Sequence, residues 1–124
     1  MAALARAVVA VCLAAAIGCD GSKPPQSPEQ LKGRLDAATG ITDPGARNAA
    51  LQPVARDAAD AGAGDIALQA ITAISNPSTR NEVAADCALR LAKRGDTKGA
   101  TAIADVITDP ATKNDVKGKI ARGA

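Results

Sequence analysis

The sequence Ile41-Thr42-Asp43-Pro44 decides the fold, because it recurs twice at a constant distance. It returns as Ile74-Ser75-Asn76-Pro77 and as Ile107-Thr108-Asp109-Pro110, each time 33 residues further along the chain. The same offset aligns further residues, namely Arg47, Arg80 and Lys113, Asn48, Asn81 and Asn114, and Gly62 and Gly95. Self-similarity at one fixed offset is typical of repeat proteins. The sequence therefore predicts repeated structural units.

Each unit has the pattern of two helices. An Asp or Asn before proline supplies an N-cap acceptor, and proline is tolerated at the first helical position. Apolar residues follow at three- and four-residue steps, as in Val83, Cys87 and Leu91. Gly62 and Gly95 are expected to end the first helix of their units. Asp65 and Asp96 are expected to cap the second helix.

The pattern predicts six helices, at residues 28–38, 45–61, 65–74, 77–93, 96–107 and 110–122. Pro53 falls inside the second of them, where proline removes a helical hydrogen bond. We expect a kink there, with a break into two pieces as the alternative. Stacked hairpins bury one another's apolar sides, so the expected fold is all-α, a short right-handed α-solenoid with a repeat of about 33 residues over 28–122. Lys117 replaces the Leu51 and Ala84 of earlier units, as expected of a capping element.

The apolar positions resemble those of the tetratricopeptide-like repeats. The positions that carry the resemblance are Val54-Ala55, Ala58, Ile71 and Ile74 in one unit, and Cys87-Ala88, Leu91, Ala104 and Ile107 in the next. The likeness covers residues 28–122. It departs in its period of 33 rather than about 34, in a proline two residues early and in the lack of aromatic residues. A HEAT-like classification competes with it.

The composition restricts the function classes. Hydrophobic residues make up 47% of the 124 residues, which fits one globular domain, but Phe, Tyr and Trp are absent. The 15 Lys and Arg nearly balance the 13 Asp and Glu. Nucleic-acid binding favours a basic cluster and stacking aromatics, so no nucleic-acid partner is expected.

The N-terminus has the pattern of an export signal. Arg6 precedes an apolar run over 7–17, which is typical of a secretory signal peptide and shorter than the ~20 residues of a spanning helix. We expect residues 1–18 to be removed. Residues 19–27 are polar and Pro-rich, as in a flexible or semi-extended tether.

The sequence Ala16-Ile17-Gly18-Cys19 resembles the bacterial lipobox, although that family prefers Leu at the position of Ala16. The resemblance implies a lipid on Cys19 and a lipoprotein of the cell envelope, anchored to a membrane by its N-terminal lipid. Asp20 resembles the signal that retains enterobacterial lipoproteins in the inner membrane, but the choice of membrane stays open. Ordinary signal cleavage near residues 14–16, with Cys19 unmodified, is the alternative.

Little in the sequence indicates catalysis. The chain has no His, the usual acid–base group at neutral pH and a common zinc ligand, so no catalytic residue, metal site or cofactor is predicted. A carboxylate pair of Asp105 and Asp109 is disfavoured because Asp109 is already assigned as a cap. Cys87 lies in a helical apolar pattern and is interpreted as a buried thiol.

Two recurring polar columns need an interpretation. Arg47, Arg80 and Lys113 are expected to reach an acidic or carbonyl group of the adjoining repeat, with a basic row for an anionic partner as the alternative. Asn48 and its equivalents Asn81 and Asn114 are expected to bond the backbone of the neighbouring loop.

Two functions remain open. The first is a protein-interaction scaffold with a protein or peptide partner. By the tetratricopeptide resemblance, its partner face lies on the first helices and comprises Gln52, Arg56, Asp60, Glu82, Leu89, Lys93, Asp115 and Arg122. The second is a structural or accessory envelope lipoprotein without a specific partner. An enzyme is not expected.

Overall fold

The computed structural model describes residues 26–123, which contain six helices and no strand. The helices are α2 (Pro28–Thr39), α3 (Pro44–Asp60), α4 (Gly64–Ala73), α5 (Pro77–Lys93), α6 (Thr97–Ala104) and α7 (Pro110–Ala121). The all-helical fold class and the six helices are confirmed. The largest difference from the expected boundaries is at α6, which ends three residues early.

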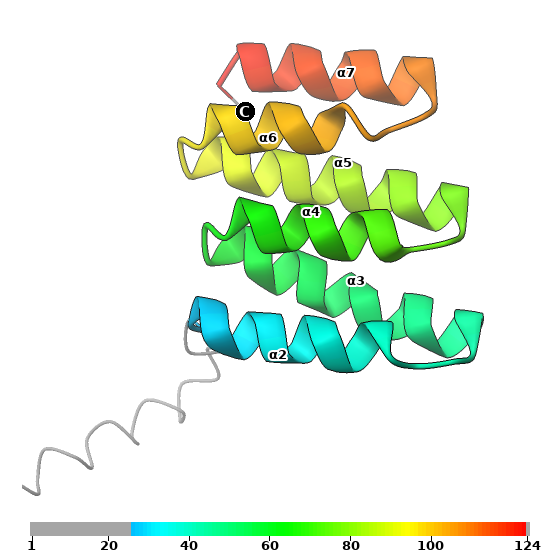
Figure 1. The fold of residues 1–124 in the computed structure, drawn as a ribbon. Helices are drawn as coiled ribbons and strands as arrows, with labels where there is room; N and C mark the ends of the chain where they lie inside the picture. The colour runs from blue at the N-terminus through cyan, green and yellow to red at the C-terminus, as the bar shows by residue number, and fades with distance from the viewer. Residues whose placement is uncertain (1–25, 124) are drawn as a thin grey trace, which may run out of the picture.

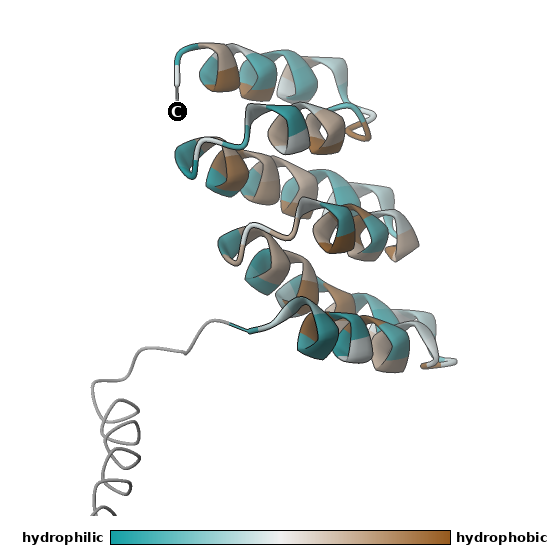
Figure 2. Cartoon of the chain, turned by 60° about the vertical axis from the view of Figure 1, so that its left-hand side comes forward, coloured by the Kyte–Doolittle hydropathy of each residue, from teal (hydrophilic) through white to brown (hydrophobic). Residues whose placement is uncertain are grey.

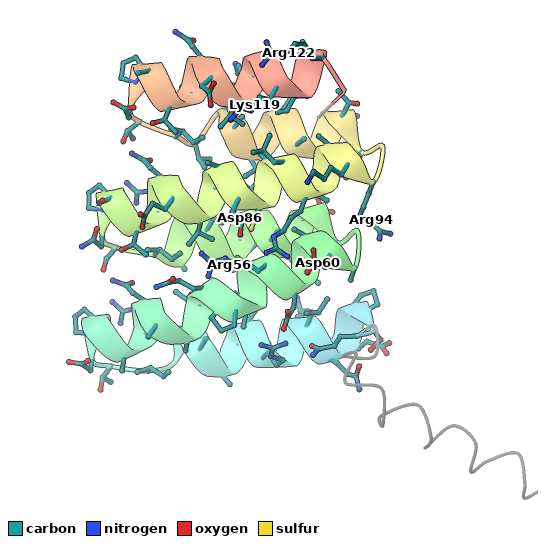
Figure 3. All side chains as sticks on the ribbon, turned by 180° about the vertical axis from the view of Figure 1, so that it is seen from behind. Arg56, Asp60, Asp86, Arg94, Lys119 and Arg122 are labelled. Carbon is teal, nitrogen blue, oxygen red and sulfur yellow. The ribbon has the colours of Figure 1, made fainter. Side chains whose placement is uncertain are left out.

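The helices form two layers (Figure 1). One layer contains α2, α4 and α6, and the other, seen from behind in Figure 3, contains α3, α5 and α7. Helices of the described part contact only near neighbours in the chain: α2 packs against α3 and α4, and α7 packs against α5 and α6. The chain therefore progresses steadily from α2 at one end of the stack to α7 at the other.

Side-chain caps fix where the helices of the α3 layer begin. Asp43, Asn76 and Asp109 accept hydrogen bonds from the backbone N–H of Ala46, Thr79 and Thr112 at 2.7, 3.0 and 2.8 Å. Each cap is followed by proline at the first helical position. The expected caps at all three recurrences are confirmed, and they align the three helix starts.

Glycines end α3 and α5. Gly62 and Gly95 have φ of 77° and 90°, in the left-handed region that disfavours residues with a Cβ. The N–H of Ala63 donates to the carbonyl of Ala58 at 2.8 Å, and that of Gly62 to Ala59 at 3.1 Å, which is the Schellman pattern. The predicted glycine stops are confirmed.

The second helices begin differently from expectation. Asp96 caps α6 by accepting from the N–H of Gly99 at 2.9 Å, as predicted. Asp65 does not cap α4, because Ala63 is the N-cap residue and makes no side-chain hydrogen bond. The prediction for Asp65 is wrong because the 33-residue offset aligns Asp96 with Ala63.

Proline at position 53 does not divide α3, which runs without interruption from Pro44 to Asp60. The alternative of a break is therefore wrong. Proline has no backbone N–H, so the carbonyl of Ala49, four residues earlier, has no helical donor. Both Pro53 and Ala49 are exposed. Water can solvate that carbonyl, so the helix tolerates the proline.

Small side chains fill much of the interior between the layers. Figure 2 shows the hydrophobic sides of the helices turned toward one another. Ala55, Ala58, Ala67 and Ala100 are fully buried, and such residues let helix backbones approach closely. Ile74 and Ile107 are also buried, whereas Ile41 in the first turn is half-buried. Two of the three recurring isoleucines therefore anchor the core.

Candidate partner-binding face

The residues expected to bind a partner lie in the layer of α3, α5 and α7. Gln52, Arg56 and Asp60 are on α3, and Glu82, Leu89 and Lys93 are on α5. Asp115 is on α7 and Arg122 is its C-cap residue. The labelled members Arg56, Asp60 and Arg122 are visible on the same side of the molecule in Figure 3.

Ion pairs occupy the boundary between α3 and α5. Arg56 Nε lies 2.8 Å from Asp86 Oδ2, and Arg90 Nη1 lies 2.7 Å from Asp60 Oδ2. Arg90 Nε also contacts Asp86 Oδ1 at 3.1 Å, so these four residues form one network, here named the α3–α5 ladder. Arg56 and Asp60 of the candidate face are therefore already engaged by the next hairpin.

The ladder changes the acidity of its members. Burial raises the pKa of Asp86, but hydrogen bonds from Arg90 and Arg56 outweigh this effect and hold the pKa below its ordinary value. Hydrogen bonds to Asp60 and Asp86 raise the pKa of Arg90. Both partners are thus charged near neutral pH.

The boundary between α5 and α7 has different chemistry. The 33-residue offset places Leu89 at the position of Arg56, Lys93 at that of Asp60 and Lys119 at that of Asp86. Leu89 is half-buried against the core, and Lys93 is exposed. Within residues 26–123, Lys119 Nζ bonds only to Asp115 Oδ2 of its own helix, at 3.0 Å. The ladder is therefore not repeated here.

The remaining two residues lie nearer the helix starts. Gln52 is half-buried and Glu82 is exposed. Glu82 helps to line an open hollow of about 480 Å³ together with Ser78, Asn81, Ala85, Asp109 and Thr112. The candidate residues thus form two groups. Those on α3 include Arg56 and Asp60, which form ion pairs with α5, whereas those on α5 and α7 form fewer ion pairs.

The asparagine column joins successive hairpins. Asn48 Oδ1 accepts from the N–H of Ser75 at 3.0 Å, and its Nδ2 donates to Ser75 Oγ at 3.2 Å. Asn81 repeats both bonds with Thr108 at 3.1 and 3.0 Å. The expectation is confirmed for these two residues. Asn114 makes no such bond in the described part of the chain, since no further turn lies beside α7.

The recurring cations Arg47, Arg80 and Lys113 form the cation column, and its two arginines bond the turn before their own helix. Arg47 Nη1 donates to the carbonyl of Ile41 at 2.9 Å, and Arg80 Nη1 donates to that of Ile74 at 3.1 Å. The expected carbonyl contacts of both arginines are confirmed, but they are made to the turn that leads into their own helix. Lys113 makes no such contact and instead lowers the pKa of Asp105 at a distance.

The opposite layer carries a shallow groove of about 580 Å³. It lies where α4 and α6 begin, beside Gly62–Gly64 and Asp96, with Ile66 and Leu68 as apolar lining. No sequence pattern indicates this groove, because its two walls come from separate hairpins.

The groups considered for chemistry have structural partners. Asp105 bonds Lys117 Nζ, and Asp109 caps α7; these hydrogen bonds lower the pKa of both carboxyls. Burial raises the pKa of the Cys87 thiol to about 12, and the Asp86 carboxylate adds to the shift. No group of three or more potential metal ligands occurs within residues 26–123.

The candidate lipidation residue Cys19 lies outside the described residues, as do the expected signal peptide and most of the tether. Over 26–123, none of the helices combines the length and the apolar character that crossing a bilayer requires. Comparison with known protein families, with curated proteins and with solved structures finds no match to this chain.

Proposed function

We propose that this protein is a bacterial envelope lipoprotein, attached to a membrane through lipid on Cys19, whose helical domain is a protein-interaction scaffold. In this proposal the helices form a short right-handed α-solenoid with a period of 33 residues. The recurring asparagine bonds to Ser75 and Thr108 support a repeated unit, and the lipobox-like sequence supports the anchor.

The observation that carries the scaffold proposal is the side-by-side arrangement of α3, α5 and α7. Three helices from successive hairpins present one extended surface, and repeat proteins bind partners on such surfaces. Leu89 and Lys93 offer that surface an apolar side chain next to an exposed cation. The argument rests on fold and surface chemistry.

The anchor is tested by fractionation of cells that express the full chain. We expect intact protein in the membrane fraction, with a mass that includes acyl chains. The Cys19→Ala chain should lose the acyl mass and leave the membrane fraction, while Cys12→Ala should behave as the intact chain. Intact protein without lipid would contradict the anchor.

The scaffold is tested by affinity capture from detergent-solubilised membranes. The face variant Glu82→Lys/Leu89→Ser/Lys93→Glu should lose the captured partner. The control Asp65→Lys/Ile66→Ser/Lys98→Glu makes matching changes on the other layer, at residues of matching burial, and should retain it. Capture of no reproducible partner, or equal loss by both variants, would contradict the scaffold and favour an accessory lipoprotein without a specific partner.

A further inference from the structure

The charge of the domain changes along the stack. Residues 93–124 contain seven Lys or Arg and four Asp, whereas residues 26–92 contain six Lys or Arg and eight Asp or Glu. The C-terminal part of the stack, residues 93–124, is therefore its cationic part. Two of these cations, Lys93 and Lys119, stand at the positions where the α3–α5 ladder has the carboxylates of Asp60 and Asp86.

Every acidic residue in this cationic part already has a structural role. Asp96 and Asp109 cap helices, and Asp105 and Asp115 pair with Lys117 and Lys119. No carboxylate there is left for the remaining cations. Lys93 and Arg122 are exposed and have no hydrogen-bond or ion-pair partner within residues 26–123.

The equivalent boundary one repeat earlier indicates what these cations lack. There, the carboxylates of Asp60 and Asp86 approach guanidinium groups to 2.7 and 2.8 Å. At the α5–α7 boundary both acids are replaced by lysine, and Arg56 is replaced by Leu89. In Figure 3, Lys119 and Arg122 on α7 lie on the same side of the molecule as Asp86 and Arg56.

We propose that Leu89, Lys93, Lys119 and Arg122 form a docking surface for an acidic segment of a polypeptide partner. The inference rests on the proposed scaffold function and names the chemistry of its partner. The partner's carboxylates bind Lys93, Lys119 and Arg122 and supply the negative charge that Asp60 and Asp86 supply in the ladder. Its apolar side chain packs on Leu89, whose half-buried side chain is continuous with the core.

The pair of Lys119 and Asp115 does not prevent this binding. It is an exposed pair one helical turn apart, with side chains 44% and 59% exposed, and such pairs contribute little to stability. Lys119 can exchange its carboxylate partner without disturbing the helix packing.

The position of the surface favours a polypeptide over lipid headgroups. The chain enters the domain at α2, and α7 is at the far end of the stack (Figure 1). Successive helices of α2, α3, α5 and α7 are in contact, and packed helices lie about 8–10 Å apart. Three such steps exceed the Debye length of about 8 Å at physiological salt, so an anchor before α2 does not hold this surface within reach of headgroup charge.

The test measures binding of a fluorescent synthetic peptide of alternating Leu, Glu and Asp to the purified full chain in detergent. The face variant is Lys93→Glu/Arg122→Glu. The control Lys32→Glu/Lys98→Glu changes the net charge equally at exposed residues on α2 and α6. We expect the face variant to bind the peptide about 10-fold more weakly at low salt, the control to bind as the intact chain, and the Gln/Asn version of the peptide not to bind.

Equal weakening in both variants, or no binding of the acidic peptide, would overturn the inference. A third arm uses phosphatidylglycerol vesicles and the Cys19→Ala chain. Vesicle binding that the face variant loses and the control keeps, without peptide binding, would assign the surface to lipid and overturn the inference. Since these measurements use purified protein, they are independent of the capture experiment. A captured partner that the Lys93→Glu/Arg122→Glu chain still retains would leave the scaffold standing and remove only the acidic surface.

Discussion

Single side chains connect one hairpin to the next. Asn48 and Asn81 each satisfy a backbone N–H and a hydroxyl in the following turn. An amide suits this role because it donates and accepts at the same time. These bonds fix the distance between the start of α3 and the turn before α5, and between the start of α5 and the turn before α7.

Replacing one of these amides should weaken the domain measurably. We expect Asn81→Ala to lower the free energy of unfolding by about 1 kcal/mol, because the N–H of Thr108 loses its acceptor. Urea unfolding followed by circular dichroism measures the change. Asn114→Ala is the matched control, since that residue makes no equivalent bond, and it should change stability by less than about 0.5 kcal/mol. Equal effects of the two substitutions would show that the hydrogen bonds of Asn81 do not stabilise the domain.

The carboxylate of Asp86 makes the stability depend on acid. Its pKa is lower in the folded state than its ordinary value, so its contribution is present above that ordinary value, about 3.9, and is lost as the pH falls through the folded pKa. As the pH falls below about 4, the intact chain should lose more stability than Asp86→Asn. Asp36→Asn, at an exposed residue on α2, should lose as much as the intact chain. A parallel decline of all three proteins would count against the ladder.

At the scale of the helices, sequence reasoning worked where a local signal exists. Asp or Asn before proline predicted three helix starts, and Gly62 and Gly95 predicted two helix ends. Ser27 and Gln30 form a capping box at α2, and their three-residue spacing is the local signal that would have predicted it. The predicted cap at Asp65 is wrong, because the residue equivalent to Asp96 at the 33-residue offset is Ala63, whose side chain cannot accept a hydrogen bond.

The proline inside α3 should reduce the stability of that helix. Proline in a helix interior costs about 3 kcal/mol relative to alanine. Part of this cost is offset because proline lowers the conformational entropy of the unfolded chain. We therefore expect Pro53→Ala to raise the free energy of unfolding by about 1 kcal/mol or more, measured by urea unfolding. Pro44→Ala, at the first helical position where proline is tolerated, should give no gain. A loss of stability in Pro53→Ala would mean that the proline is required.

At the scale of the whole molecule, the periodic pattern predicted the six helices but not the ion pairs between them. Arg56 and Asp86 are 30 residues apart, as are Asp60 and Arg90. This separation is one period less about one helical turn, so aligning units at 33 residues does not reveal it. The ladder also occurs at only one boundary, and a pattern that does not recur leaves no periodic signal. The division of the candidate face into two parts follows from that local difference.

Charged side chains occupy both ends of the stack. Arg34 stands at the position of the buried Ala67 and Ala100, and Lys117 at that of Leu51 and Ala84. Each joins an ion pair, Arg34 with Asp57 at 2.7 Å and Lys117 with Asp105 at 2.6 Å. Buried apolar positions thus become polar where no further helix of the described part covers them.

Removing both charges should promote association. We expect Arg34→Ala/Lys117→Leu to form concentration-dependent head-to-tail oligomers, because each end would then offer an apolar contact to the other. Sedimentation velocity of the full chain in detergent detects them. The control Lys32→Ala/Lys98→Leu makes similar changes at exposed lysines that form no ion pair within residues 26–123, and it should sediment as the intact chain. An unchanged sedimentation coefficient in the end variant would argue against a capping role.

The buried thiol of Cys87 can report how often the helices of this domain separate. It is the one thiol within residues 26–123, no part of it is accessible, and its high pKa keeps it protonated. A maleimide added to the Cys12→Ala/Cys19→Ala chain can modify it only during moments when the helices separate. The rate of labelling therefore reports the rate of those openings. This is useful because the protein has no Trp or Tyr and so gives no signal in the usual fluorescence methods.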